Sequence, residues 1–218
     1  MNTIETYMTK LLTPEKIQRN KEAKFTSEEA ESAIYIDFEG FEDKKPSMIG
    51  TLIGEKFEQV IFDETLRLAA EFNDLSFIPI ELYLTTLRDK AVAEGRRIVA
   101  YSSHEKTMFQ QHANLDISAQ YADARLIAKV LRRKLEPDRP RPKALKEYFE
   151  LIGYNRPAYL GERLTTSRIR AVADMLGKRK SFQSLTPVVK AKWTKLLQHN
   201  KHDVVGMRAL IRTVVNAQ

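Results

Sequence analysis

The chain contains no cysteine among its 218 residues, which excludes disulfide bonds and thiolate metal sites. A metal ion would therefore have to be held by carboxylates, histidines or water. No segment approaches the roughly 18 apolar residues that span a membrane. The first residues include acidic side chains and no apolar core, so they do not resemble a signal peptide. These absences predict a cytoplasmic protein that does not engage a membrane.

Negative charge is in the minority, because 29 Asp and Glu residues face 36 Lys and Arg residues, for a formal net charge of +7. A basic balance favours a polyanionic partner, of which nucleic acid is the most plausible. Many soluble proteins are basic without binding nucleic acid, so the charge alone leaves both interpretations open. The length suits one domain of moderate size.

Short apolar runs near the start of the chain indicate a sheet. Residues 1–32 are charged and predict a helical arm or extension, and the remaining residues, 33–218, form the main domain. Apolar runs at 33–38, 48–53 and 57–62 have the close spacing of an antiparallel meander of three strands. Gly54 and Glu55 would close the second hairpin.

The rest of the chain has mainly helical patterning. Phe77, Ile80, Leu84 and Leu87 recur at helical spacing, and Gly95 is a plausible stop. Residues 97–101 predict a central fourth strand, because the run from Ile98 to Tyr101 is apolar throughout.

Further elements are expected downstream of that strand. Helices are predicted at 104–111, 123–135, 143–152 and from 186 towards 215, with Gly206 as a weak point of the last one. A final strand is expected between about 155 and 182. The order of elements predicts an α/β protein with a mixed central sheet, three antiparallel strands followed by parallel strands, flanked by helices.

Asp37 and Glu39 are the first candidates for chemistry. Residues two apart on a strand project to the same face, so these carboxylates point together while Ile36 and Phe38 point into a core. Two neighbouring carboxylates on a central strand repel each other and resist desolvation, and a divalent cation removes both problems. The alternative is an edge strand with a solvated acidic face.

Two later segments carry further candidates. Glu105 follows the fourth strand at the start of a helix, where α/β sites form, although an acid there also suits the helix dipole. His199 and Asp203 are four residues apart and share one face of the last helix. The alternative for this pair is an ordinary polar turn of an amphipathic helix.

In this order the three segments resemble the DEDD exonucleases of the ribonuclease H-like superfamily. The resemblance is strongest to the predicted-exonuclease branch, in which the fourth strand runs into a Tyr-Asn-x-x-(Asp/Glu)-like segment and the late helix ends its motif in Asp-Val. The segments Tyr101-Ser102-Ser103-His104-Glu105 and Asp203-Val204 fit that form. The similarity covers roughly residues 33 to 215.

The resemblance implies a ribonuclease H-like nuclease domain over residues 33–218 that trims DNA or RNA from a 3′ end. It implies four metal ligands, Asp37, Glu39, Glu105 and Asp203, holding two Mg²⁺ or Mn²⁺ ions. Two positions depart from the family. Glu105 stands where the wider superfamily has Asp, and His199 stands where one subfamily has Tyr, while the His of the other subfamily would fall on Gln198. His199 is the candidate base or water-orienting residue.

Clustered basic residues are candidates for contact with the phosphate backbone. They are Arg132, Arg133, Lys134, Arg139, Arg141, Lys143, Lys146, Lys178, Arg179 and Lys180. A solvated helix face and loop is the equally weighted alternative. Two other functions stay open, namely a ribonuclease H-like nucleic-acid-binding or scaffold protein without catalysis, and a partner that docks on another protein through its N-terminal arm. The sequence does not distinguish DNA from RNA.

Overall fold

Six strands form one mixed sheet at the centre of the structure, a computed structural model that describes residues 24–41, 45–135, 142, 144–161 and 163–217. The strand order is β4-β3-β2-β1-β5-β6. The strands are β1 (Ile34–Gly40), β2 (Pro46–Ile53), β3 (Lys56–Ile61), β4 (Ser76–Phe77), β5 (Ile98–Ala100) and β6 (Tyr121–Asp123). Antiparallel pairing joins β1, β2 and β3, and parallel pairing adds β5 and β6 on one side and β4 on the other.

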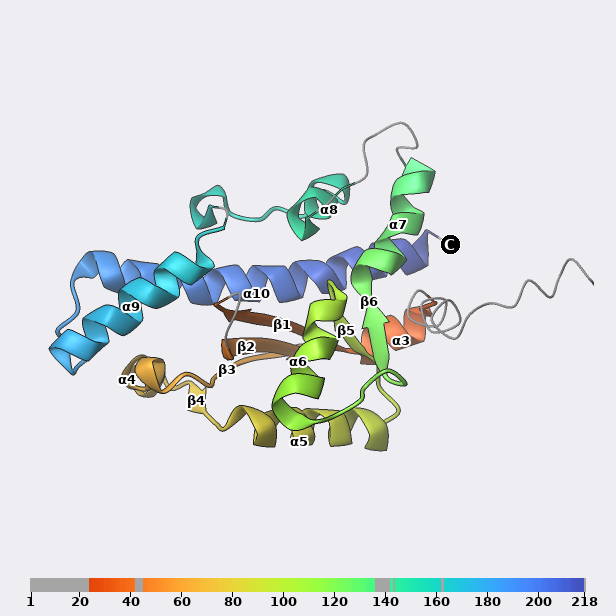
Figure 1. The fold of residues 1–218 in the computed structure, drawn as a ribbon. Helices are drawn as coiled ribbons and strands as arrows, with labels where there is room; N and C mark the ends of the chain where they lie inside the picture. The colour runs from red at the N-terminus through yellow and green to blue at the C-terminus, as the bar shows by residue number, and fades with distance from the viewer. Residues whose placement is uncertain (1–23, 42–44, 136–141, 143, 162, 218) are drawn as a thin grey trace, which may run out of the picture.

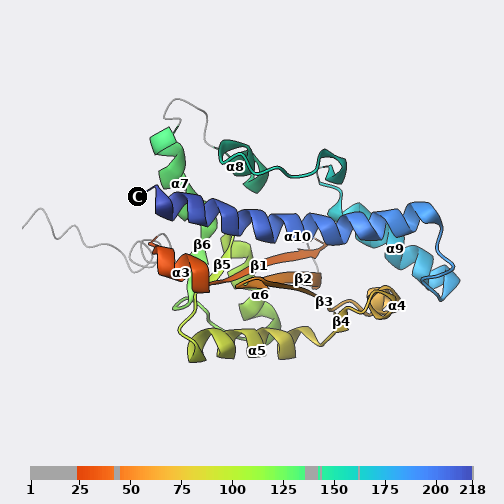
Figure 2. The ribbon, with the colours of Figure 1, turned by 180° about the vertical axis from the view of Figure 1, so that it is seen from behind.

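Helices cover both faces of this sheet. The α-helices are α3 (Ser27–Ser32), α4 (Arg67–Phe72), α5 (Ile80–Ala93), α6 (Ser103–Ala113), α7 (Ala124–Leu135), α8 (Leu145–Leu151), α9 (Thr165–Arg179) and α10 (Pro187–Asn216). Two short 3₁₀ helices are η1 (Glu64–Leu66) and η2 (Ala158–Leu160). Figures 1 and 2 show α10 running the length of one face and α5 lying on the opposite face. No helix in the described ranges is long and apolar enough to cross a membrane.

The predicted meander and central strand are confirmed. β1, β2 and β3 pair in sequence order, and Gly54 and Glu55 form the turn between β2 and β3. Gly54 adopts a φ of 55°, a left-handed conformation that glycine reaches without a steric penalty. β5 pairs in parallel with β1. The α/β class and the mixed sheet flanked by helices are therefore as predicted.

Two predictions about the sheet are wrong. The segment 155–182 contains η2 and α9 and no strand among its described residues; Ile169, Val172 and Leu176 form the buried stripe of α9 instead. The missing strand is β6, which is only three residues long, too short to show a period of two. Phe77 belongs to β4 and not to α5, because Pro79 disfavours a helical conformation in the residue before it.

The alternation of side chains along β1 divides the core into two layers. Ile34 and Ile36 are buried against α5 and α6, and Phe38 packs at the edge of the same cluster. Tyr35, on the other face, packs with residues of α7 and α10. This alternation directs the odd-numbered residues of β1 toward α10.

The N-terminal helix α3 packs against this core. The side chains of Thr26 and Glu29 form a capping box that satisfies backbone groups at the start of α3. Phe25 and Ala30 are buried in the cluster formed with α7 and α10. Of the predicted arm, residues 24–32 therefore pack on the domain, and residues 1–23 lie outside the described residues.

Helix α10 is continuous over 30 residues and passes through Gly206 without a break, so the prediction of a weak point at this glycine is wrong. The glycine serves packing instead. A Cβ at position 206 would lie 2.4 Å from Cζ of Phe149, which belongs to α8. Figure 1 shows α8 on the side of α10 that faces away from the sheet. The absence of a side chain at Gly206 lets the ring approach the helix backbone.

We expect Gly206→Ala to destabilise the protein by about 1–3 kcal/mol, because the added methyl group overpacks the contact with Phe149. Gly177→Ala is the matched control, since Gly177 is also helical but a Cβ there meets no atom within 4 Å. That change should stabilise by roughly 0.5–1 kcal/mol through the higher helix propensity of alanine. Urea unfolding of both variants measures the difference. Equal effects of the two substitutions would contradict the packing explanation.

Candidate active site

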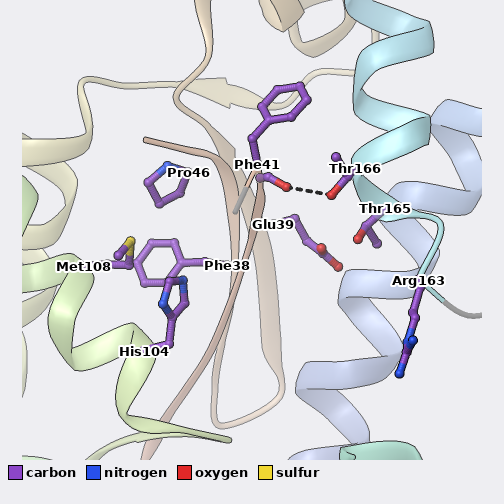
Figure 3. A pocket seen from close by; sticks show the side chains of 10 residues that line it. Phe38, Glu39, Phe41, Pro46, His104, Met108, Arg163, Thr165 and Thr166 are labelled. Atoms are coloured by element: carbon purple, nitrogen blue, oxygen red, sulfur yellow. Dashed lines mark hydrogen bonds between the residues drawn. The ribbon is translucent and has the colours of Figure 1, made fainter. Parts of the chain in front are cut away.

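The acidic residues of β1 face the last helix, as the strand periodicity predicts. Asp37 lies opposite Gly50 of β2 and Glu39 opposite Met48. Glu39 is buried, with 8% of its surface exposed. Figure 3 shows its side chain directed toward Thr165, the first residue of α9.

Helix α10 brings two further candidates to Glu39. Ligand atoms of Glu39, His199 and Asp203 all lie within 4.8 Å of one another. Nε2 of His199 is 3.3 Å from Oδ2 of Asp203, one helical turn along α10. Residues separated by about 160 positions in the chain therefore meet because α10 crosses β1.

Electrostatic repulsion from neighbouring acids shows that Asp37 lies near the same cluster. Burial raises the pKa of Asp37 well above its ordinary value, and the negative charges of Glu39, Asp203 and Glu105 raise it further. These three residues come from three different elements. The other three acids predicted from the sequence are thus close enough to Asp37 to influence its ionisation.

Glu105 enters the site from the first turn of α6, as predicted. It is 7% exposed, and its burial raises the pKa of the carboxyl to about 7. The hydroxyl of Ser102, the N-cap of α6, donates a hydrogen bond to Oε2 of Glu105 at 3.1 Å and opposes this shift. Asp123 adds a further negative charge that raises the pKa of Glu105.

The pKa of Glu39 is also raised by its surroundings. Burial, followed by the charge of Asp203, raises its pKa to about 8. A hydrogen bond from Thr165 and the positive charges of Arg168 and Arg156 act in the opposite direction. Asp37, Glu39 and Glu105 therefore resist ionisation unless more positive charge is supplied.

Asn200 orients Asp37, a role that the sequence reasoning missed. Its Nδ2 donates to Oδ2 and to the backbone oxygen of Asp37, both at 2.9 Å. Its Oδ1 accepts from Nε2 of Gln59 at 2.9 Å, and its side chain fills the space above Gly50. Asn200 is completely buried. A signal existed, because Asn200 is a polar residue on the apolar stripe that includes Trp193 and Leu196.

Arg156 is the second residue that the sequence reasoning missed. Its Nε is 3.3 Å from Oδ1 of Asp203, and its Nη2 is 2.7 Å from Nδ1 of His199. Its Nη1 donates to the backbone oxygen of Gly161 at 3.2 Å. Both ring nitrogens of His199 are therefore engaged by Arg156 or Asp203. A role of His199 as a base stays a prediction that requires Arg156 to withdraw.

Among the predicted basic residues, the structure describes the side chains of Lys146 and of Lys178 to Lys180, and these two groups lie in different places. Lys146 of α8 lines a hollow of about 450 Å³ together with His199 and Asp203. Arg132, Arg133 and Lys134 lie in α7, but their side chains are outside the described part of the structure, as are Arg139, Arg141 and Lys143 altogether.

The remaining basic run, Lys178 to Lys180, is exposed at the end of α9 that is far from Glu39. A helix of 15 residues is about 22 Å long, so this run lies about that distance from Thr165. A nucleic acid would have to extend along α9 to contact both the acids and this run.

The donor set of the cluster fits a hard divalent cation. Its carboxylate oxygens could hold Mg²⁺ or Mn²⁺, whereas its one imidazole, that of His199, is paired with Arg156 and Asp203. No protein-family model, curated protein or solved structure matches the chain. The geometry of the site is therefore the basis for assigning a function.

Proposed function

We propose that the protein is a metal-dependent nuclease of ribonuclease H-like fold that hydrolyses phosphodiester bonds of DNA or RNA. The observation that carries this proposal is the cluster of Glu39, His199 and Asp203, whose ligand atoms lie within 4.8 Å of one another, together with Asp37, whose pKa is raised by burial and by the charges of Glu39, Asp203 and Glu105. Keeping these acids together, with Glu39 and Glu105 buried, is costly unless positive charge compensates them, and a divalent cation would supply that charge. The resemblance to DEDD exonucleases supports 3′–5′ trimming.

The acids would hold Mg²⁺ or Mn²⁺, and two ions are expected from the resemblance. A bound ion would lower the pKa of a coordinated water and act as a Lewis acid toward the phosphate. The protein's own contribution is orientation. Asn200 fixes the Asp37 carboxylate, and Ser102 fixes Glu105 from the N-cap of α6. Such supporting hydrogen bonds keep ligands in place and are typical of metal sites.

The proposal is tested by incubating the purified protein with end-labelled single-stranded and duplex DNA and RNA in Mg²⁺ or Mn²⁺. We expect shortening of at least one substrate, no product in EDTA, and loss of activity to the blank level for Asp37→Ala. That loss follows because the remaining acids no longer provide a complete ligand set. Absence of product with every substrate and both metals, from folded protein, would contradict the proposal.

A second function, nucleic-acid binding without catalysis, is favoured by one contact. The guanidinium of Arg156 lies on Asp203 and His199, where it supplies positive charge without a metal. This alternative predicts salt-sensitive binding that Asp37→Ala leaves unchanged, and a melting temperature that Mn²⁺ does not shift. The predicted protein partner of the N-terminal arm concerns mainly residues outside the described ranges.

A further inference from the structure

Three arginines lie near the acid cluster, two from the segment between α8 and α9 and one from α9 itself, and they differ in what they contact. Arg156 is paired with Asp203 and His199. Arg168 is 4% exposed, and its guanidinium donates to the backbone oxygen of Leu160. Arg163 is exposed and makes no ion pair or hydrogen bond with any residue that the structure describes. Of the three, Arg163 is the arginine that is both exposed and without a partner among the described residues.

Arg163 lies at the junction of two hollows that flank the acids. One, of about 450 Å³, is lined by His199 and Asp203, and the other, of about 420 Å³, by Glu39. Arg163 lines both of them. Figure 3 shows Arg163 on the same side of Glu39 as Thr165, with its side chain extending away from Thr165. A group that passes from one hollow to the other meets the acids and this cation together.

The backbone holds Arg163 in a conformation that non-glycine residues rarely adopt, with a φ of 52°. Contacts on both sides brace the turn. Gly161, two residues earlier, accepts a hydrogen bond from Arg156, and Thr166, three residues later, donates to the backbone oxygen of Gly40 at 3.2 Å. Strained conformations of this kind persist only where the surroundings enforce them, and they concentrate at binding sites.

We propose that Arg163 binds a backbone phosphate of a nucleic-acid strand that crosses the acid cluster from one hollow to the other. This inference rests on the proposed function and assigns the residue that first engages its substrate. A phosphodiester is repelled by the ionised carboxylates of the cluster, and a guanidinium at the junction offsets that repulsion. Arginine is suited to this role because its planar fork donates two parallel hydrogen bonds to phosphate oxygens.

The test is the affinity of fluorescent 12-nucleotide single-stranded DNA and RNA, measured by anisotropy in EDTA at several salt concentrations. Arg163→Gln should weaken binding about tenfold and lower the salt slope by about 1, because one phosphate contact is lost. Arg163→Lys keeps the charge but not the fork, so it should recover part of the affinity. Arg88→Gln is the matched control, since Arg88 is on α5, across the sheet, and pairs with Asp89.

Arg163→Gln binding both oligonucleotides as tightly as the unmodified protein would overturn the inference, as would an equal loss for Arg88→Gln. Failure of the unmodified protein to bind either oligonucleotide would also overturn it. Failure of this inference can be distinguished from failure of the nuclease proposal. Binding that depends on Arg163, with no cleavage in Mg²⁺ or Mn²⁺, upholds this inference and refutes the nuclease. Cleavage together with binding that Arg163→Gln leaves unchanged refutes this inference and upholds the nuclease.

Discussion

Asp37→Asn is expected to stabilise the protein in EDTA at pH 8 while removing its response to metal. Asp37 is a carboxyl whose pKa is raised by burial and by three neighbouring acids, so ionising it at this pH costs folding free energy. The Asn amide has nearly the same shape, and its oxygen can accept the hydrogen bond from Asn200. A gain of about 1–3 kcal/mol would raise the melting temperature of a chain of this length by several degrees.

The pH dependence of this gain has a definite sign. Acids whose pKa is raised in the folded state bind more protons when folded than when unfolded, so the stability they contribute is lost as pH rises. For Glu39 the interval runs from its ordinary value of 4.5 to about 8, and for Glu105 from 4.5 to about 7. The metal-free protein should therefore lose stability between pH 5 and pH 8. The advantage of Asp37→Asn should likewise grow as the pH rises, because the pKa of Asp37 is also raised.

Differential scanning calorimetry with EDTA or Mn²⁺ at both pH values measures these effects. Mn²⁺ should raise the melting temperature of the unmodified protein and leave Asp37→Asn unchanged. Asp174→Asn is the control, because Asp174 is exposed on α9, where substitutions change stability by roughly 0.5 kcal/mol or less. A lower melting temperature for Asp37→Asn than for the unmodified protein in EDTA at pH 8 would refute the proposed repulsion.

Arg156→Ala is expected to bind Mn²⁺ at least about tenfold more tightly and to be less stable without metal. The guanidinium now neutralises part of the charge of Asp203 and Glu39, and it would repel a divalent cation at the same carboxylates. Removing one partner of a largely buried ion pair leaves the other uncompensated, which costs about 3–5 kcal/mol at most sites of this kind. Metal binding would then recover that stability.

Isothermal titration with Mn²⁺ and melting in EDTA test the two parts separately. Arg156→Lys keeps the positive charge, so its affinity for Mn²⁺ should stay near that of the unmodified protein. Weaker Mn²⁺ binding by Arg156→Ala would show that Arg156 mainly positions His199 and Asp203 for the metal. Mn²⁺ binding by neither protein would favour the second function, in which Arg156 permanently supplies the positive charge.

Much of the fold follows from local patterns in the chain. The runs that form β1, β2 and β3 are apolar and close together in the chain. The two-residue turn between β2 and β3 makes these two strands pair as an antiparallel hairpin. β6 and β4 escaped detection because three and two residues cannot show a period. The predicted weak point at Gly206 is wrong because the low helix propensity of glycine is only one consequence of its missing side chain. In this helix the missing side chain permits close contact with Phe149.

In the candidate site, too, some residues follow from local patterns in the sequence and others do not. The shared face of Asp37 and Glu39 follows from the strand period, and that of His199 and Asp203 from the helix period. Asn200 was detectable in principle as a polar residue on a buried stripe. Arg156 and Arg163 were not, because their segment has no regular period and contacts residues more than 40 positions away, such as His199.

The sequence by itself determined the mixed sheet, the helices that cover it and the carboxylates that share a face, because these depend on periods of two and 3.6 residues that are local to each element. Only the tertiary structure decided which positive charge meets those carboxylates. That outcome depends on how an aperiodic segment folds back over α10, and it leaves Arg156 paired with Asp203 and Arg163 free of any described partner.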